Sequence, residues 1–175
     1  MSNSGILGAV LAGGRSTRFG SNKAEAVLDG RTLLDHARAR LAGWCGAVVV
    51  IGAGADCVPD WPQPGMGPLG GIAGALRFAR DAGFGAVLTC GVDSLGLPDD
   101  LPELLAPGPA YVADQPVVGL WPVAAAGAVE AILAGSGRHS MRALAEAVGA
   151  RAVMLPSPSI NVNTPADLAR IRGEG

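Results

Sequence analysis

Three positively charged side chains and three glycines crowd a short stretch near the N-terminus. Residues 6–10 form an apolar run, and the glycine-rich segment that follows contains Arg15, Arg18 and Lys23. A strand that ends in a glycine-rich turn presents its backbone N–H groups to a ligand, and glycine lets a phosphate approach the backbone closely. Because the whole chain has a net charge of −2, this local excess of positive charge predicts an anion-binding loop.

The loop matches neither of two well-known phosphate-binding motifs. In the P-loop pattern G-x-x-x-x-G-K-[ST] the lysine directly follows a glycine, whereas Gly20 is followed here by Ser-Asn-Lys. The dinucleotide pattern G-x-G-x-x-G also fails, because the glycines of this loop are Gly13, Gly14 and Gly20. By itself the segment could also be a solvated surface loop.

A carboxylate after a later apolar run is the candidate metal ligand. Residues 86–90 form this run, and Asp93 follows it. Mg²⁺ takes one or two carboxylate oxygens and completes its shell with phosphate and water, so Asp93 near an anion-binding loop predicts a Mg²⁺ site. The alternative is a turn aspartate that caps the loop of residues 94–98.

Several other polar residues lie among turn-forming residues and have simple structural explanations. Asp60 stands in a Pro-Asp-Trp-Pro sequence, which by itself indicates a turn. Asn161 and Asn163 precede a Thr-Pro pair, where capping of a following helix explains the pattern. Arg138 lies in a glycine-rich connection, where a solvated arginine is the ordinary interpretation.

Strand-like and helix-like segments alternate along the chain. Apolar runs indicate buried strands at 6–10, 47–51 and 86–90, and helical spacing indicates helices at 33–41 and 72–82. This alternation predicts a doubly wound α/β sheet, whose ligands bind beyond the carboxyl ends of the strands. The glycine-rich loop and the candidate metal ligand should therefore lie at the same edge of the sheet.

The remaining sequence predicts shorter elements. Residues 59–71, which are rich in proline and glycine, indicate an ordered loop. The other elements are a short helix at 98–105, two strands paired antiparallel at 110–113 and 117–121, helices at 123–133 and 141–148, a strand at 152–154 and a last helix from 164 or 165 to 172. The fold class is α/β, with a mostly parallel sheet and a small antiparallel part.

The composition excludes several classes of protein. Apolar residues make up 49 % of the 175 residues, but no apolar run reaches the ~20 residues of a membrane helix. The N-terminus lacks the basic region of a secretory signal, and the low aromatic content argues against nucleic-acid binding. We expect a single cytoplasmic domain over residues 1–175, with reduced thiols at Cys45, Cys57 and Cys90.

Residues 11–23 read L-A-G-G-R-S-T-R-F-G-S-N-K. This segment resembles the signature loop of the MobA-like nucleotidyltransferases, the family of molybdenum cofactor guanylyltransferase. In that family the L-A-G-G backbone lies on the guanine side of the nucleoside triphosphate, and the lysine, here Lys23, meets the phosphates. The resemblance implies that four loop residues contact the nucleotide: Leu11, Ala12, Gly13 and Gly14. Cytidylyl-transferring relatives tend to have alanine at the position of Gly13.

The resemblance also assigns roles to the isolated carboxylates. It implies that Asp60, which precedes a Gly-Pro-Leu segment, contacts the nucleotide, and that Asp93 binds the metal. The family context of that aspartate is Cys-x-Asp-x-Pro, but this chain has Leu95 where proline is expected. After the second strand the family has an asparagine near the base, where this chain has Ile51. The guanine contact would then fall to the backbone or to another side chain, or base selectivity would be weaker.

On the acceptor side, the resemblance implies that Asn161 and Asn163 reach back into the site and that Arg138 holds the acceptor phosphate. The implied fold is a three-layer, Rossmann-like nucleotidyltransferase domain. The implied reaction is transfer of GMP from Mg-GTP to molybdopterin, which yields the guanine dinucleotide cofactor and pyrophosphate. Lys23, Arg18 and Asp93 would be the catalytic residues, Mg²⁺ the cofactor, and proteins that deliver the molybdenum cofactor the partners.

Two alternatives remain open at the level of sequence. The first is a related transferase that uses CTP or a sugar-phosphate acceptor, because the loop specifies the donor better than the acceptor. The second is a nucleotide-binding protein without catalytic activity, suggested by Ile51 and by the missing proline after Asp93.

Overall fold

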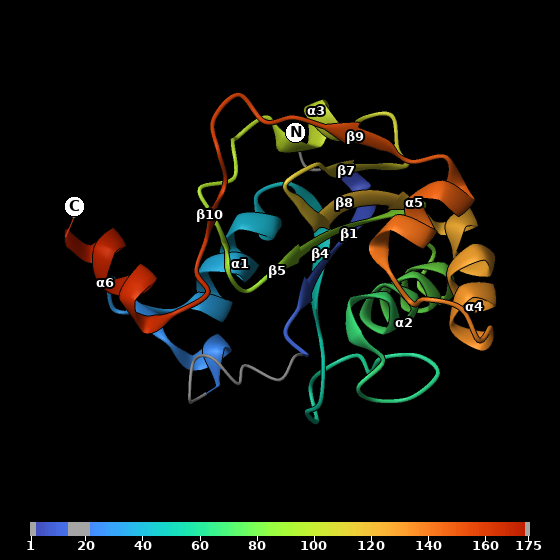
Figure 1. The fold of residues 1–175 in the computed structure, drawn as a ribbon, viewed down its shortest axis with the longest axis horizontal. Helices are drawn as coiled ribbons and strands as arrows, with labels where there is room; N and C mark the ends of the chain where they lie inside the picture. The colour runs from blue at the N-terminus through green and yellow to red at the C-terminus, as the bar shows by residue number, and fades with distance from the viewer. Residues whose placement is uncertain (1–2, 14–21, 174–175) are drawn as a thin grey trace.

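A six-stranded sheet forms the centre of the computed structural model, which describes residues 3–13 and 22–173 (Figure 1). The strand order is β4-β1-β5-β8-β7-β9. β8 runs antiparallel to both of its neighbours, and the other neighbouring pairs are parallel. The strands are β1 (Asn3–Leu11), β4 (Cys45–Ile51), β5 (Ala86–Gly91), β7 (Ala110–Val112), β8 (Gln115–Pro122) and β9 (Arg151–Val153). The predicted α/β class and mostly parallel sheet are confirmed.

Helices cover both faces of this sheet (Figure 1). One face carries α1 (Leu33–Ala42) and α3 (Leu101–Leu105), whose buried side chains join one hydrophobic cluster. The other face carries α2 (Gly67–Asp81), α4 (Ala126–Ala134) and α5 (Met141–Val148), which share a second cluster. No helix in the described part of the chain is long and apolar enough to span a membrane.

The central strand β1 shows why the sequence adopts this layered arrangement. Its side chains alternate between the two clusters, with Ile6 and Val10 facing α1 and with Leu7 and Ala9 facing α2. A parallel strand covered on both faces needs apolar residues at every position, which matches the continuous apolar run in the sequence.

Smaller elements surround the sheet. A 3₁₀ turn, η1 (Lys23–Glu25), leads into a hairpin of β2 (Val27–Leu28) and β3 (Arg31–Thr32), and a second 3₁₀ turn, η2 (Val123–Ala125), precedes α4. β6 (Ser94–Leu95) pairs antiparallel with β10 (Ile160–Asn161). The final helix, α6 (Pro165–Gly173), buries Leu168 against Leu28, Leu33 and Val162.

Most predicted elements are confirmed within a few residues. The two predicted strands around residue 114 form the antiparallel pair β7 and β8, and the helices after them agree with α4, α5 and α6. The helix predicted over 98–105 is shorter, because α3 begins at Leu101. The three cysteines are free thiols, and Cys45 and Cys90 are buried.

The prediction that residues 47–51 form a buried strand is wrong in one respect. β4 forms an edge of the sheet, where Gly46 and Ala47 are exposed and residues 48–50 are half-buried. A parallel bridge between Ile51 and Val58 covers part of this edge. An apolar run cannot show whether a strand has one neighbour or two, because that depends on the strand order.

The predicted boundary between the loop of residues 59–71 and the next helix is also wrong. α2 begins at Gly67, so the Gly-Pro-Leu-Gly-Gly segment forms its first turns. Pro68 lies in the first turn, where a backbone N–H has no partner within the helix and its loss costs little.

Glycines in α2 serve close packing against the preceding loop. A Cβ atom at Gly74 would lie 2.3 Å from the carbonyl oxygen of Pro59, and one at Gly70 would lie 2.4 Å from Cβ of Met66. Both distances are too short for any side chain. These glycines therefore indicate contact between helix and loop rather than an interruption of the helix.

A hydrogen-bonded pair of polar side chains lies in the core between β5 and β8. The indole Nε1–H of Trp121 donates to Thr89 Oγ1 at 3.0 Å, and this hydroxyl donates to the carbonyl oxygen of Val117 at 2.6 Å. Both side chains are fully buried. The hydroxyl thus satisfies an indole donor that has no access to water.

We predict that Thr89→Val lowers the free energy of unfolding by about 1–3 kcal/mol, because it leaves the buried Trp121 N–H without a partner. Thr89→Ser is the control, since it keeps the hydroxyl and removes one methyl group. Urea unfolding followed by tryptophan fluorescence measures both. A valine variant as stable as the wild type would contradict the role of this hydrogen bond.

Candidate functional site

Lys23 and Asp93 form an ion pair where β1 and β5 end. Lys23 Nζ lies 2.9 Å from Asp93 Oδ2, and the two side chains are 15 % and 24 % exposed. β1 and β5 are parallel neighbours, with Leu11 opposite Gly91. The expectation that the residues after these strands lie at one edge of the sheet is therefore confirmed for this pair, and Lys23 is the only lysine in the sequence.

The 3₁₀ turn η1 holds Lys23 in place. Asn22 Oδ1 accepts a hydrogen bond from the backbone N–H of Ala24 at 3.2 Å and caps this turn. Ala24 itself is buried in the cluster beneath α1. The residues before and after Lys23 are thus both held in place, by the Asn22 cap and by the burial of Ala24.

A tight turn after β5 positions Asp93. The backbone N–H of Gly91 donates to Ser94 Oγ at 3.3 Å, and Ser94 is buried. A Cβ atom at Gly91 would lie 2.4 Å from Asp93 Oδ1, so the carboxylate can occupy this place only above a glycine. Sequence reasoning missed this role of Gly91, although a glycine two residues before the aspartate was a usable signal.

The C-terminal segment crosses this turn. The backbone N–H of Val162 donates to the carbonyl oxygen of Asp93 at 3.2 Å, and β10 pairs with β6 just after Asp93. Val162 is buried, whereas Asn161 and Asn163 on either side of it are exposed. The backbone contact of Val162 thus brings the segment of both asparagines next to Asp93, and their role towards an acceptor stays a prediction.

The capping interpretation of this segment is confirmed as well, but through Thr164. Thr164 Oγ1 accepts from the backbone N–H of Asp167 at 3.1 Å, and Asp167 Oδ2 accepts from the N–H groups of Asn163 and Thr164 at 3.0 and 2.9 Å. These backbone donors lower the pKa of Asp167, because they stabilise its charged form. The side chain of Asn163 is not needed for the cap.

A second carboxylate lies beside the end of β1 on the α2 side. A Cβ atom at Gly13 would lie 3.7 and 3.9 Å from the two carboxylate oxygens of Asp60, and 3.5 Å from Cα of Gly52. The backbone N–H of Gly65 donates to Asp60 Oδ2 at 3.3 Å. Asp60 and Gly13, predicted as separate nucleotide contacts, therefore line the same small space.

Partial burial changes the acidity of Asp60. Desolvation raises its pKa above the ordinary value of 3.8, and the hydrogen bond from Gly65 offsets part of this rise. A half-buried carboxylate whose charge is incompletely solvated is well suited to accept hydrogen bonds from a ligand.

Ile51, the residue that departs from the family pattern, belongs to the core. It is buried at the end of β4, and its side chain lies against Gly71 of α2, as does the side chain of Leu11. Its carbonyl oxygen accepts from the N–H of Ala12 at 2.9 Å. Ile51 thus supports the loop backbone from below and offers no polar group to a base.

The remaining predicted site residues either make no contact with the Lys23–Asp93 pair or lie outside the described residues. Arg138 is exposed between α4 and α5, and no hydrogen bond or ion pair among residues 3–13 and 22–173 joins it to Lys23 or Asp93. Gly14 and Arg18 lie outside the described residues.

The donor set fits a hard divalent cation that is bound partly by substrate. Across the described ranges, no group of three or more His, Cys, Asp or Glu side chains could hold a metal ion by itself. A lone Asp93 carboxylate fits Mg²⁺, which commonly uses one or two carboxylates together with substrate phosphates. The buried thiol of Cys90 does not compete, because burial raises its pKa to about 12 and keeps it protonated.

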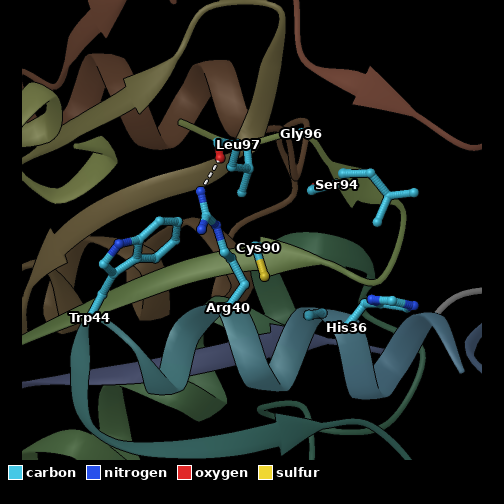
Figure 2. Close-up of a pocket in the computed structure, with 9 residues that line it drawn as sticks. His36, Arg40, Trp44, Cys90, Ser94, Gly96 and Leu97 are labelled. Atoms are coloured by element: carbon cyan, nitrogen blue, oxygen red, sulfur yellow. Dashed lines mark hydrogen bonds between the residues drawn. The ribbon is translucent and has the colours of Figure 1, made fainter. Parts of the chain in front are cut away.

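A cavity of about 220 Å³ lies on the α1 face, next to the turn that carries Asp93 (Figure 2). Arg40 reaches across it from α1, donates to the carbonyl oxygen of Leu97 and lies 2.7 Å from the Asp99 carboxylate. Its guanidinium also stacks 4.6 Å from the ring centre of Trp44. Arg40 therefore clamps α1 to the segment that follows the turn.

Comparison with known proteins gives a consistent result. Residues 8–157 match the family model described as MobA-like NTP transferase domain. The chain is 38 % identical to a molybdenum cofactor guanylyltransferase of Acidiphilium cryptum, over 95 % of this chain and 94 % of that protein. It is 35 % identical to a molybdenum cofactor guanylyltransferase of Rhodobacter capsulatus, over 94 % of each.

The fold also resembles a solved structure. Molybdopterin-guanine dinucleotide biosynthesis protein A from Archaeoglobus fulgidus superposes with a TM-score of 0.72 at 21 % identity, over 96 % of this chain and 97 % of that one. At this level of identity, the likeness concerns the fold alone.

We predict that Asp60 contributes a measurable pH dependence to stability. Because its pKa is raised on folding, the folded protein binds this proton more tightly than the unfolded chain does. The free energy of unfolding of the wild type should therefore fall relative to Asp60→Asn as the pH rises from about 4 to 7.

Urea unfolding across this pH range measures the difference between the two proteins. Asp56→Asn serves as the control, because Asp56 is exposed in the same region of the chain. A difference between wild type and Asp60→Asn that stays constant with pH would contradict the raised pKa.

Proposed function

The chain belongs to the MobA-like NTP transferase family, and from this we propose that it transfers GMP from Mg-GTP to the terminal phosphate of molybdopterin, the organic part of the molybdenum cofactor. The products are the guanine dinucleotide cofactor and pyrophosphate. The observation that best supports this proposal is the pairing of Lys23 with Asp93 at the same sheet edge as Gly13 and Asp60.

The reaction requires little acid–base chemistry. The acceptor is a phosphate that is already anionic, so it attacks the α-phosphorus of GTP without a strong general base. The main barrier is electrostatic, because two anions must meet in line while negative charge builds up around phosphorus. Positively charged groups that are fixed in advance reduce this barrier most effectively.

The described residues can supply these groups. Lys23 donates N–H bonds to phosphate oxygens, and Asp93 would hold Mg²⁺ through its carboxylate. When bound, this ion neutralises charge on the triphosphate. Arg18, which the sequence places in the same loop, is proposed as a second cation beside the phosphates.

Asp60 is the proposed guanine contact. The Watson–Crick edge of guanine carries two adjacent donors, N1–H and the 2-amino group, and a carboxylate offers two parallel acceptors. Cytosine and adenine lack this pair of donors. The position of Asp60 beside Gly13 and the burial of Ile51 both favour Asp60 for this role, with the backbone of Leu11, Ala12, Gly13 and Gly14 beneath the nucleotide.

The acceptor would approach from the side of β10. Asn161 and Asn163 are exposed amides next to Asp93 and are proposed to bind the acceptor, with Arg138 as a further phosphate contact. We also propose that residues 1–175 act as one cytoplasmic domain and that other proteins deliver the molybdenum cofactor to it.

Pyrophosphate release tests this function directly. Mg-GTP, Mg-CTP and Mg-ATP are each supplied with and without molybdenum-loaded molybdopterin. We expect release only with GTP plus the pterin. Pyrophosphate release with CTP instead would identify CTP as the donor. Tight GTP binding without pyrophosphate release under any condition would favour a nucleotide-binding protein without catalytic activity.

We predict that Gly91→Ala lowers kcat about 100-fold, because the new Cβ occupies the place of Asp93 Oδ1 and displaces the carboxylate by about an ångström. The nearest neighbours of this Cβ are side-chain atoms of Asp93 and Ser94, so the variant should still fold. Gly127→Ala is the control, since Gly127 lies in α4 with open space around its Cβ position. Equal loss of activity in both variants would contradict the positional role of Gly91.

A further inference from the structure

The Lys23–Asp93 pair has a consequence for the order in which ligands can bind. The two residues assigned to the metal and to the phosphates contact each other directly. A divalent cation that approaches Asp93 must therefore compete with an ammonium group already 2.9 Å from the carboxylate.

The pair is more than a transient surface contact. Exposed ion pairs contribute little to the stability of the folded protein, because water screens both charges. Here the side chains are only 15 % and 24 % exposed, and each is fixed by its own turn. Removal of one partner alone leaves a poorly solvated charge, which is costly.

Binding of the metal alone, of the triphosphate alone and of both together leaves different charges without a partner. If a metal ion displaced Lys23 without nucleotide, the ammonium would lose its counter-ion and face a divalent cation at close range. If a triphosphate took Lys23 without metal, the Asp93 carboxylate would face additional negative charge. When both ligands arrive, Lys23 moves to a phosphate oxygen and Asp93 to the metal, so every charge keeps a partner.

We propose that Lys23 is the counter-cation of Asp93 in the nucleotide-free protein and that its exchange onto phosphate couples metal binding to nucleotide binding. This inference rests on the proposed function, because it assumes a metal–nucleoside triphosphate ligand. Linkage requires the coupling to be reciprocal: the nucleotide raises metal affinity by the same factor by which the metal raises nucleotide affinity. A factor of at least about tenfold is expected, within the usual range for coupled sites.

Metal binding in the absence of nucleotide provides the first test. Mn²⁺ binding is measured by electron paramagnetic resonance for wild type, Lys23→Met and Asp93→Asn. We expect Lys23→Met to bind Mn²⁺ about tenfold more tightly than wild type, because the competing ammonium is gone. Asp93→Asn should lose this binding, which identifies the carboxylate as the ligand.

Two control variants separate competition at this pair from a change in overall charge. Arg77→Met removes one positive charge from a different ion pair, with Glu130 of α4, and should leave Mn²⁺ affinity unchanged. Lys23→Arg keeps the charge and should remain close to wild type. Equal Mn²⁺ affinity of wild type and Lys23→Met, or absence of binding in both, would overturn the proposal.

The second test adds the α,β-methylene analogue of GTP, whose bond between the α- and β-phosphates cannot be cleaved. The phosphates of the analogue ligate Mn²⁺ in both proteins, so affinity should rise in both, but the increase should be about tenfold larger in wild type than in Lys23→Met. An equal increase in both proteins would overturn the role of Lys23. Failure of the analogue to bind would instead overturn the proposed nucleotide function. The Mn²⁺ affinities of wild type and Lys23→Met without nucleotide would still show whether Lys23 competes with the metal for Asp93.

The sequence offers an unusually clean spectroscopic probe of the exchange. Because Lys23 is the only lysine, lysine-selective ¹³C labelling gives a single ε-methylene signal. Mg²⁺ or the analogue alone, at concentrations that suffice for the joint complex, should leave this signal in place, and the two together should shift it. A full shift with Mg²⁺ alone would contradict coupled exchange.

Discussion

The contact between Lys23 and Asp93 is the interaction on which the candidate site depends. These two opposite charges lie 70 residues apart in the chain and meet because β1 and β5 are parallel neighbours that end at the same level. A separate turn positions each charge. Asn22 caps the turn that carries Lys23, and Gly91 leaves room for the carboxylate in the turn that carries Asp93. The pairing of β1 with β5 thus places the cation of Lys23 next to the anion of Asp93.

Close backbone approach is the second constraint, and it fixes the other carboxylate. α2 can cross the loop before it only because Gly70 and Gly74 have no side chains. This contact holds the loop that carries Asp60 against the end of β1, where Gly13 leaves space beside the carboxylate. The two carboxylates therefore have different neighbours: Asp60 lies beside Gly13 at the end of β1, and Asp93 contacts Lys23 after the end of β5.

The sequence predicted most of this arrangement because buried parallel strands leave a strong signal. Uninterrupted apolar runs located β1 and β5, and the rule that ligands bind at carboxyl ends placed Lys23 and Asp93 at one edge. Its errors share one cause. Glycine and proline usually end helices, so the sequence predicts a loop up to Gly71, although Gly70 in the first turns of α2 serves close packing. The apolar composition of residues 47–51 likewise predicts a buried central strand, although β4 lies at the edge of the sheet.

The sequence by itself determined the fold class and the identity of its single lysine, and it predicts an anion-binding loop, because these follow from local residue types and spacing. Only the tertiary structure decided that Lys23 neutralises Asp93, that Gly91 makes room for that carboxylate and that Ile51 faces the core. These are contacts between residues far apart in the chain. Their distances depend on strand order and helix packing, which no local pattern encodes.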